Sequence, residues 1–360
     1  MNMTGSERKL RVGIIGLQHE SHVGVFIHYL VKESKTAEFV AVAEEEARYL
    51  RDMEAYENVR QYADYQEMLE KEKPDAVFVD MINNRKSEAV CECLKRKIAV
   101  NINKPLCASF AQLENVVGMY EKTGGILTLQ LNERKNKAYI EMKKAIEEGK
   151  VGVPIAIQAS RPHTLFRPKT FKHGRPKWMF NGEQYGGVLM DLGIHDIDLV
   201  RWLSGAEVVA VTASEGNAKY CREYPEFTDY GMMLLKLTDG KVACLEVDWL
   251  NPVNSPAQCI FVIYGTEGRA AIEAGPQGPV FKIIRNDNEV IYAGGQSGNT
   301  MGLNAFDFFQ SVIEGSACQP NAGDVLMDTL VALCAHRSAV QKKEIVMKDV
   351  DLYERIKALK

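Results

Sequence analysis

The sequence lacks several features that would place it in other classes of protein. No apolar run in its 360 residues approaches the ~20 that a helix needs to cross a bilayer. The start of the chain, Met1 to Lys9, has no apolar core of the kind found in a secretory signal. Basic residues do not outnumber acidic ones (44 against 48), whereas a protein that binds nucleic acid needs a basic face. We therefore expect a cytoplasmic protein that acts on a small molecule, with neither nucleic acid nor membrane as a partner.

Cysteine pairs and metal-binding motifs are also missing. The eight cysteines are scattered, without a Cys-x-x-Cys pair or a Cys/His cluster at zinc spacing. Cys91 and Cys93 lie two apart in an expected helix, so they point to different faces and cannot chelate one ion together. His19 and His22 would need one more residue between them to match the zinc-protease pattern. The sequence thus predicts reduced thiols and no metal.

The first part of the chain alternates short apolar runs with helical patterns. The runs have the length of strands and cover residues 10–17, 39–43, 75–79, 98–102 and 126–131. Continuous apolar strands separated by helices predict a parallel sheet that is buried on both faces. We therefore expect a doubly wound α/β domain, the Rossmann fold, over residues 1–130.

After Gly149 the pattern changes to strands in direct succession. These expected strands cover residues 155–160, 208–214, 230–237, 242–249 and 259–265. Asp239-Gly240 between two of them is a hairpin signal, which predicts an antiparallel sheet. Helical patterns over 191–203 and 324–341 should cover one face of it. We expect an α+β domain over residues 131–360, packed against the first domain with a cleft between them.

The turn after the first strand is a candidate phosphate site. It reads Gly-Leu-Gln-His-Glu-Ser, so only the first glycine of the dinucleotide fingerprint G-x-G-x-x-G is present. A strand that runs into a helix here still offers backbone N–H groups to a pyrophosphate. The alternative is a plain strand-to-helix turn. The expected cofactor contacts in this turn are Gly16, Leu17, Gln18, His19, Glu20 and Ser21.

Glu44 ends the second strand, where a carboxylate accepts hydrogen bonds from the ribose hydroxyls of adenosine. Its charge would repel a 2′-phosphate, so NAD is the expected cofactor. NADP is the alternative if Arg48 or Lys35 reaches the adenosine. Glu44 could equally be part of the solvated acidic start of the next helix.

Four segments carry a family resemblance. They are VGIIGL (12–17), NKPL (103–106), GGVLMDLGIHDID (186–198) and YGTEG (264–268). Through them the chain resembles, nearly end to end, the glucose–fructose oxidoreductase / inositol dehydrogenase / rhizopine-catabolism (Gfo/Idh/MocA) family. The resemblance implies hydride transfer between a nicotinamide and a secondary alcohol or ketone of a sugar, cyclitol or sugar derivative. It also implies a homodimer or homotetramer formed through the C-terminal sheet.

The resemblance implies that Lys104, Asp191 and His195 surround the reacting carbon. Asp191 and His195 are four residues apart, so on a helix they share one face. Histidine titrates near neutral pH and suits the base that takes the hydroxyl proton. The lysine cation can stabilise the developing alkoxide. Asp191 can orient the histidine or bind a substrate hydroxyl.

Departures from the family pattern fall in the cofactor half. Asn103 stands where the family has glutamate, and Met81 to Lys86 (MINNRK) keeps only the asparagine of Thr-Pro-Asn-x-x-His. Asn83, Asn103 and Lys104 are nevertheless expected to contact the cofactor. Two alternatives follow from the departures. One is a silent family member that senses a sugar or nucleotide, and the other is an enzyme that holds its cofactor permanently.

Residues 161–177 form the most basic stretch of the chain and contain no acid. This stretch could be a cleft wall that attracts a sugar acid or a phosphorylated sugar, or else a solvated loop or a subunit contact. The expected substrate contacts are Arg134, His163, Arg167, Trp178, Asp191 and His195.

Overall fold

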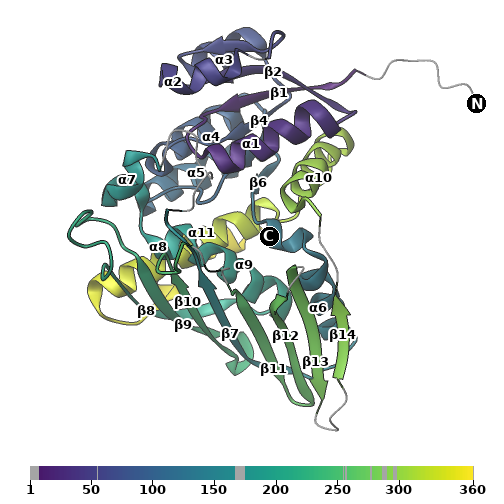
Figure 1. The fold of residues 1–360 in the computed structure, drawn as a ribbon, viewed down its shortest axis with the longest axis vertical. Coiled ribbons are helices and arrows are strands. Elements are labelled where there is room, and N and C mark those ends of the chain that lie inside the picture. The colour runs from purple at the N-terminus through teal and green to yellow at the C-terminus, as the bar shows by residue number, and fades with distance from the viewer. Residues whose placement is uncertain are drawn as a thin grey trace, which may run out of the picture.

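A computed structural model describes residues 8–54, 56–166, 175–253, 255, 258–275, 278–285, 290–294 and 298–359. Two sheets lie at opposite ends of the molecule, with helices between them (Figure 1). None of the helices in these ranges is both long and apolar enough to cross a membrane.

The first sheet has six strands in the order β3-β2-β1-β4-β5-β6, and every neighbouring pair is parallel. The strands are β1 (Leu10–Ile15), β2 (Ala37–Ala43), β3 (Arg60–Tyr62), β4 (Ala76–Val79), β5 (Ala99–Ile102) and β6 (Leu127–Leu129). β4 and β5 are buried at every residue, which explains their continuous apolar sequence. The predicted doubly wound sheet is confirmed. Only β3 was missed, because it has three residues, mostly exposed, at the sheet edge.

Helices cover both faces of this sheet. On one face lie α3 (Tyr65–Glu72), α4 (Lys86–Lys95) and α5 (Phe110–Thr123). On the other lie α1 (Glu20–His28) and, from much later in the chain, α10 (Thr300–Glu314). Phe309 of α10 is fully buried, and its ring centroid lies 5.9 Å from that of Phe26 in α1. A helix from the expected second domain therefore completes the core of the first.

The second sheet has nine strands in the order β14-β13-β12-β11-β7-β10-β9-β8-β15. All pairs are antiparallel except β7–β10, so the predicted, mainly antiparallel sheet is confirmed. The strands are β7 (Pro154–Pro162), β8 (Val208–Gly216), β9 (Tyr230–Leu237), β10 (Val242–Asp248), β11 (Ile260–Gly265), β12 (Gly268–Gly275), β13 (Gly278–Arg285), β14 (Val290–Gly294) and β15 (Ile345–Val346).

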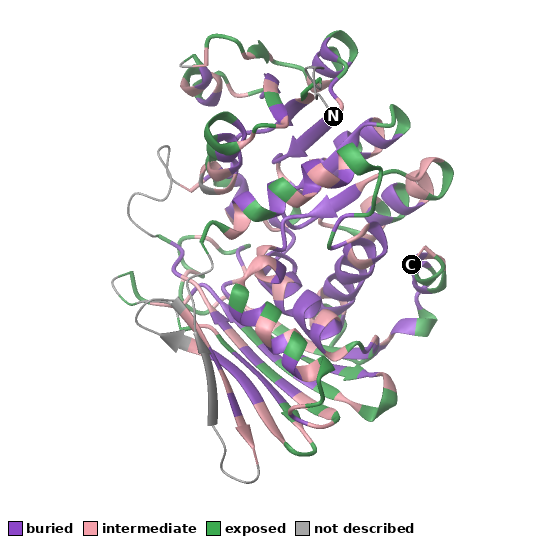
Figure 2. Cartoon of the chain, turned by 90° about the vertical axis from the view of Figure 1, so that its right-hand side faces the viewer, coloured by how far each residue is buried: buried purple, intermediate pink, exposed green. Residues whose placement is uncertain are grey.

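One face of the second sheet is covered by helices and the other is open. The covering helices are α6 (Lys137–Glu147), α9 (Gly193–Ser204) and α11 (Ala322–Gln341). Along β9 and β10, buried and exposed residues alternate, as expected for a sheet with one solvated face (Figure 2). The remaining helices are the short α2 (Ala47–Leu50), α7 (Gly182–Tyr185), α8 (Val188–Asp191) and α12 (Leu352–Lys357).

Candidate active site

The site begins where the order of the first sheet reverses, between β1 and β4, because ligands of such folds bind at this point. Gly16 ends β1 there with a φ of +89°, a conformation that L side chains rarely adopt. A Cβ on Gly16 would lie 2.6 Å from the backbone carbonyl carbon of Asp80, which follows β4. The one glycine that remains of the fingerprint is therefore the one that the close approach of β1 to this loop requires.

Two carboxylates organise the turn that follows. Glu44 accepts hydrogen bonds from the backbone N–H of Leu17 (2.8 Å) and from the side-chain amide of Gln18 (3.2 Å). Asp80 accepts one from the backbone N–H of His19 (2.9 Å). Burial raises the pKa of Glu44, while these donors oppose that rise. The ribose contact expected of Glu44 stays a prediction, and its carboxylate also accepts hydrogen bonds from the turn itself.

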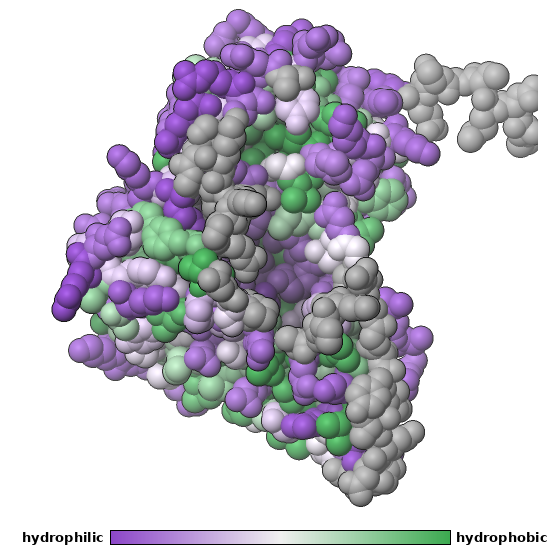
Figure 3. All heavy atoms as spheres, in the orientation of Figure 1, coloured by the Kyte–Doolittle hydropathy of each residue, from purple (hydrophilic) through white to green (hydrophobic). Residues whose placement is uncertain are grey.

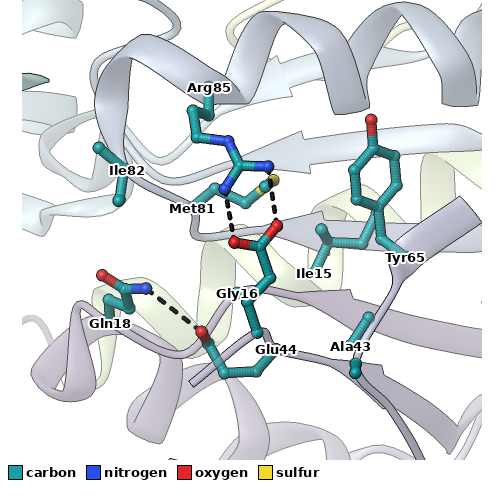
Figure 4. Close-up of a pocket in the computed structure, with 11 residues that line it drawn as sticks. Ile15, Gly16, Gln18, Ala43, Glu44, Tyr65, Met81, Ile82 and Arg85 are labelled. Atoms are coloured by element: carbon teal, nitrogen blue, oxygen red, sulfur yellow. Dashed lines mark hydrogen bonds and ion pairs between the residues drawn. The ribbon is translucent and has the colours of Figure 1, made fainter.

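A pocket opens beside this turn, at the carboxyl ends of β1 and β2 (Figure 4). Gly16, Gln18 and Glu44 line it, as the sequence suggested for a cofactor site. Its other walls, which the sequence did not reveal, include Tyr65 and Arg85. The guanidinium of Arg85 forms a bidentate ion pair with Glu45 at 2.6 and 2.7 Å.

The structure of this region suits a dinucleotide. Helix α1 begins at Glu20 without a side-chain cap, so its N-terminus can receive a pyrophosphate. The Oε1 atom of Gln18 is buried without a hydrogen-bond partner, so a ribose hydroxyl could donate to it. Ser21 lies in the first turn of α1, and its side chain is outside the part of the chain that is described.

Asn83 and Asn103 lie beside the site and form hydrogen bonds with the residues around it. Asn83 donates to the carbonyl of Tyr185 (2.9 Å), and its own side-chain oxygen accepts from Lys86 (2.9 Å). Asn103 donates to Asp80 (2.5 Å) and shares a hydrogen bond with Nδ1 of His22 (2.9 Å). Both asparagines are fully buried. The cofactor contacts expected of them stay a prediction, and the hydrogen bonds that the structure shows for both asparagines are to the protein itself.

Lys104 and Asp191 form a buried ion pair across the two halves of the chain. Lys104 follows β5, and its ammonium donates to Asp191 at the end of α8. The hydroxyl of Tyr185 donates to the other oxygen of Asp191 (3.0 Å), and Trp249 in turn donates to that hydroxyl (2.8 Å). Burial opposes the ionisation of Asp191, but the Lys104 charge outweighs it and holds the pKa of Asp191 well below its usual value.

His195 lies in α9 with a side chain that is 12% exposed. Its Nδ1 atom lies 3.0 Å from Oε2 of Glu133, in a short 3-10 helix after β6, η4 (Asn132–Lys135). The other Glu133 oxygen accepts from Arg161 (2.8 Å). Asp191 ends α8 whereas His195 lies in α9, so the expectation that the two share one helical face is wrong, and they have different hydrogen-bond partners. Sequence reasoning missed Glu133, since nothing near it in the chain marks it.

His163, which directly follows β7, lies near Lys104, Asp191 and His195. Burial lowers the pKa of His163 to about 3, helped by the positive charges of Arg161, Lys104 and His195. Its imidazole is therefore neutral, and its buried Nδ1 has no hydrogen-bond partner. The buried Nε1 of Trp178 also lacks a partner, and the indole packs edge-on against His19 at 4.8 Å between centroids. The structure thus brings His163 and Trp178 to the same region as the three catalytic candidates.

Arg134 serves a different purpose from the one expected. It is buried, and its guanidinium binds Asp198 (2.9 and 3.0 Å from Nε) and Asp324 (3.1 Å). The expected substrate contact is therefore corrected to a buried ion pair that fastens η4 to α9 and α11. Arg167 lies outside the described residues, as do the neighbouring basic residues 168–174.

The two histidines near the turn lie close to each other. His19 and His22 stack with their ring centroids 6.0 Å apart, and His22 is hydrogen bonded to Asn103. Over the ranges that the structure describes, no three His, Cys, Asp or Glu side chains are grouped so that they could hold an ion. All eight cysteines are free thiols.

A parallel-sheet domain with a dinucleotide-type pocket, joined to an α+β domain that adds an aspartate and a histidine, defines a two-domain oxidoreductase. Comparison with known families agrees with this class. Residues 10–131 match the oxidoreductase family with an NAD-binding Rossmann fold, and residues 139–271 match the GFO/IDH/MocA C-terminal domain. The chain belongs to the GFO/IDH/MocA family of oxidoreductases.

Individual relatives are distant. The chain is 24% identical to a myo-inositol 2-dehydrogenase of Thermotoga maritima, over 73% of this chain and 77% of that protein. A putative oxidoreductase of the same organism has a similar structure, with a TM-score of 0.81 at 22% identity over 94% of this chain and all of the other. An Agrobacterium radiobacter oxidoreductase in complex with NAD⁺, L-tartaric acid and magnesium gives 0.80 at 17% identity, over 98% and 100%. These structures show that the fold is shared.

The Gly16 turn can be tested with a matched pair of glycines. We expect Gly16→Ala to weaken NADH binding about tenfold or more, because the added Cβ must displace the Asp80 backbone and strain φ. Gly24→Ala in the same segment is the control. A Cβ there would meet nothing within 4 Å, and alanine favours a helix by up to ~1 kcal/mol. Fluorescence titration with NADH measures both variants, and equal affinities would contradict the assigned turn.

Buried neutral His163 makes the fold sensitive to acid. Below pH ~6.5 the unfolded chain binds a proton at this residue that the folded chain refuses until about pH 3, so stability falls as the pH is lowered through this window. We expect His163→Gln to remove up to ~1.4 kcal/mol of that loss per pH unit. Urea unfolding at pH 7, 6 and 5 measures the slope, with His28→Gln, an exposed position, as the control. An unchanged slope in His163→Gln would show that this residue is not buried in its neutral form.

Proposed function

We propose that the protein transfers a hydride between NAD(P) and a secondary alcohol or ketone of a sugar, cyclitol or sugar derivative. The observation that carries this proposal is the position of the Lys104–Asp191 pair. It lies at the carboxyl edge of the parallel sheet, where the loop after β5 meets α8. The dinucleotide pocket opens at the same edge, beside β1 and β2. Acid–base groups and a cofactor pocket on one edge are what such a reaction needs.

Each of the three residues has a task that its surroundings support. The bound nicotinamide would accept or return the hydride. His195 takes the proton of the substrate hydroxyl during oxidation and returns it during reduction. The Lys104 ammonium stabilises the negative charge that develops on that oxygen, and Asp191 and Tyr185 hold the ammonium in place. The partly exposed His195 can exchange its proton with solvent.

The unpartnered polar atoms of the site favour a neutral polyol as the substrate. Nδ1 of His163 and Nε1 of Trp178 are buried hydrogen-bonding atoms that hydroxyl groups could satisfy. Arg161 is already paired with Glu133 and Asp196, so it does not supply a cation for an acid. Several relatives are named as inositol dehydrogenases, which act on a neutral cyclitol. A sugar acid is the alternative if the basic residues 167–174 reach the cleft.

The proposed reaction is tested by His195→Ala. We expect its kcat with the best substrate in a panel of cyclitols, sugars and sugar acids to fall by roughly 10²-fold, because the proton has no acceptor. NADH affinity should stay within about twofold of the wild type, since His195 lies outside the pocket. Nicotinamide absorbance measures turnover, and titration with NADH and NADPH measures binding. Cofactor binding by the wild type without turnover on the whole panel would instead support a sensor.

We further propose that copies of the chain associate through the open face of the second sheet. Hydrophobic side chains are exposed there among polar ones, over the lower part of Figure 3. They include Met232 and Leu234 of β9, Val242 of β10, and Ile260 and Tyr264 of β11. Exposed hydrophobic side chains on one face of a sheet are typical of a surface that another copy covers.

The association can be tested by Leu234→Lys, which places a charge in the middle of the patch. We expect light scattering to give a multiple of 40.3 kDa for the wild type and a mass closer to a single chain for the variant. Lys236→Leu on the same strand is a matched control, because it removes a charge from the same face. A wild type that stays monomeric at high concentration would refute the proposed interface.

A further inference from the structure

Two separate networks of hydrogen bonds and ion pairs lie at the site. One contains Lys104 and Asp191, and the other contains His195. The first consists of Lys104, Asp191, Tyr185 and Trp249. The second runs from His195 through Glu133 to Arg161 and Asp196. One carboxylate oxygen of Asp191 accepts a hydrogen bond from Lys104, and the other accepts one from Tyr185. The group that controls His195 is therefore in the second network.

We propose that Glu133 is the positioning residue of His195, an inference that rests on the proposed function. It holds the imidazole with Nδ1 protonated and directs Nε2 toward the substrate hydroxyl. The chemistry of the contact fixes this assignment, because an ionised carboxylate can only accept a hydrogen bond. At 3.0 Å from Oε2 of Glu133, Nδ1 of His195 must therefore be the donor. The free lone pair of the neutral ring is then on Nε2.

Arg161 keeps the carboxylate of Glu133 ionised and in place. Its guanidinium donates to Oε1 of Glu133 (2.8 Å) and binds Asp196 (2.7 Å) with its other end. Burial opposes the ionisation of Glu133, but the charges of His195 and Arg161 outweigh it and hold the pKa of Glu133 well below its usual value. A negative Glu133 stabilises, by its charge, the imidazolium that forms when the substrate gives its proton to His195.

The proton balance of the step is complete within these groups. During oxidation the substrate O–H bond breaks and its proton joins Nε2 of His195, while the C–H bond of the carbon that carries this oxygen would give its hydride to a bound nicotinamide. The resulting imidazolium donates to Glu133 through Nδ1 and is stabilised by its charge. Because His195 is 12% exposed, water can then remove the proton from Nε2.

Other titratable groups face this pair. His163 directly follows β7, the strand that contains Arg161, and is neutral above about pH 3. Asp196, one residue after His195, is paired with Arg161. Lys104 and Asp191 form their own ion pair. The test of the proposal must therefore change Glu133 alone and measure an effect that depends on His195.

The test compares Glu133→Gln with Glu133→Asp. In Glu133→Gln we expect kcat for oxidation to fall about 10- to 100-fold at neutral pH, with NADH affinity unchanged within about twofold. Glu133→Asp keeps the charge and should recover part of the rate. Glu121→Gln, in an exposed pair with Arg355, is the control.

A double-mutant cycle separates positioning from general damage to the fold. If Glu133 acts through His195, Glu133→Gln should cost almost nothing further in the His195→Ala background. A purely structural Glu133 would lower activity by the same factor in both backgrounds, and this result would overturn the proposal. Thermal unfolding of each variant checks that it is folded at the assay temperature.

A second measurement needs no substrate, so it distinguishes failure of this inference from failure of the proposed function. The chain has seven histidines, and nitrogen-15 NMR of histidine-labelled protein, with His195→Ala for assignment, reports the tautomer of His195. We expect the Nδ1-protonated neutral ring in the wild type. The Nε2-protonated ring in the wild type would refute the role of Glu133 whatever reaction the protein catalyses.

Discussion

The buried ion pair between Lys104 and Asp191 is the constraint on which the rest of the site depends. Removing two charges from water is costly, and their attraction compensates only if further hydrogen bonds satisfy both groups. Tyr185 and Trp249 complete the shell of Asp191. On the other side, the buried ammonium of Lys86 donates to the carbonyls of Asn103 (2.8 Å) and Lys104 (3.3 Å), which fixes the loop that presents Lys104. The two halves of the chain are held in register by this arrangement.

Separation of the two charge networks has a chemical consequence. Lys104 and Asp191 form a permanently charged pair, with the positive end available to an oxygen that becomes negative. His195 and Glu133 form a pair whose charge changes when a proton arrives. Because Asp191 is not shared between the two, stabilisation of the alkoxide and uptake of the proton can be adjusted independently. Arg161 couples the second pair to Asp196, so that neither carboxylate is left buried without a cation.

The backbone of the phosphate turn is positioned here without the second and third glycines of the usual fingerprint. In the glycine-rich fingerprint, missing side chains let the backbone approach the cofactor. Here only Gly16 remains. The backbone that follows it is held by two carboxylates: Glu44 accepts a hydrogen bond from the N–H of Leu17, and Asp80 accepts one from the N–H of His19. These carboxylates place negative charge near an anion site. The uncapped start of α1 opposes that charge, because it presents positive potential.

Sequence and tertiary structure determined different parts of this protein. The apolar strands, their helical spacers and the change after Gly149 predicted the type of both sheets, because periodicity reflects burial directly, although β3 and β12 to β14 were not among the expected strands. Short motifs singled out Lys104, Asp191 and His195 as candidates. Partners were not predictable: Glu133 reaches His195 across 62 residues, Lys104 reaches Asp191 across 87, and α10 joins a core built near the N-terminus. The same limit misplaced Arg134, whose residue type suits a ligand but whose guanidinium is paired within the fold. Residue types and spacing in this chain determine which elements form, whereas hydrogen bonding and charge compensation depend on which elements the fold brings together.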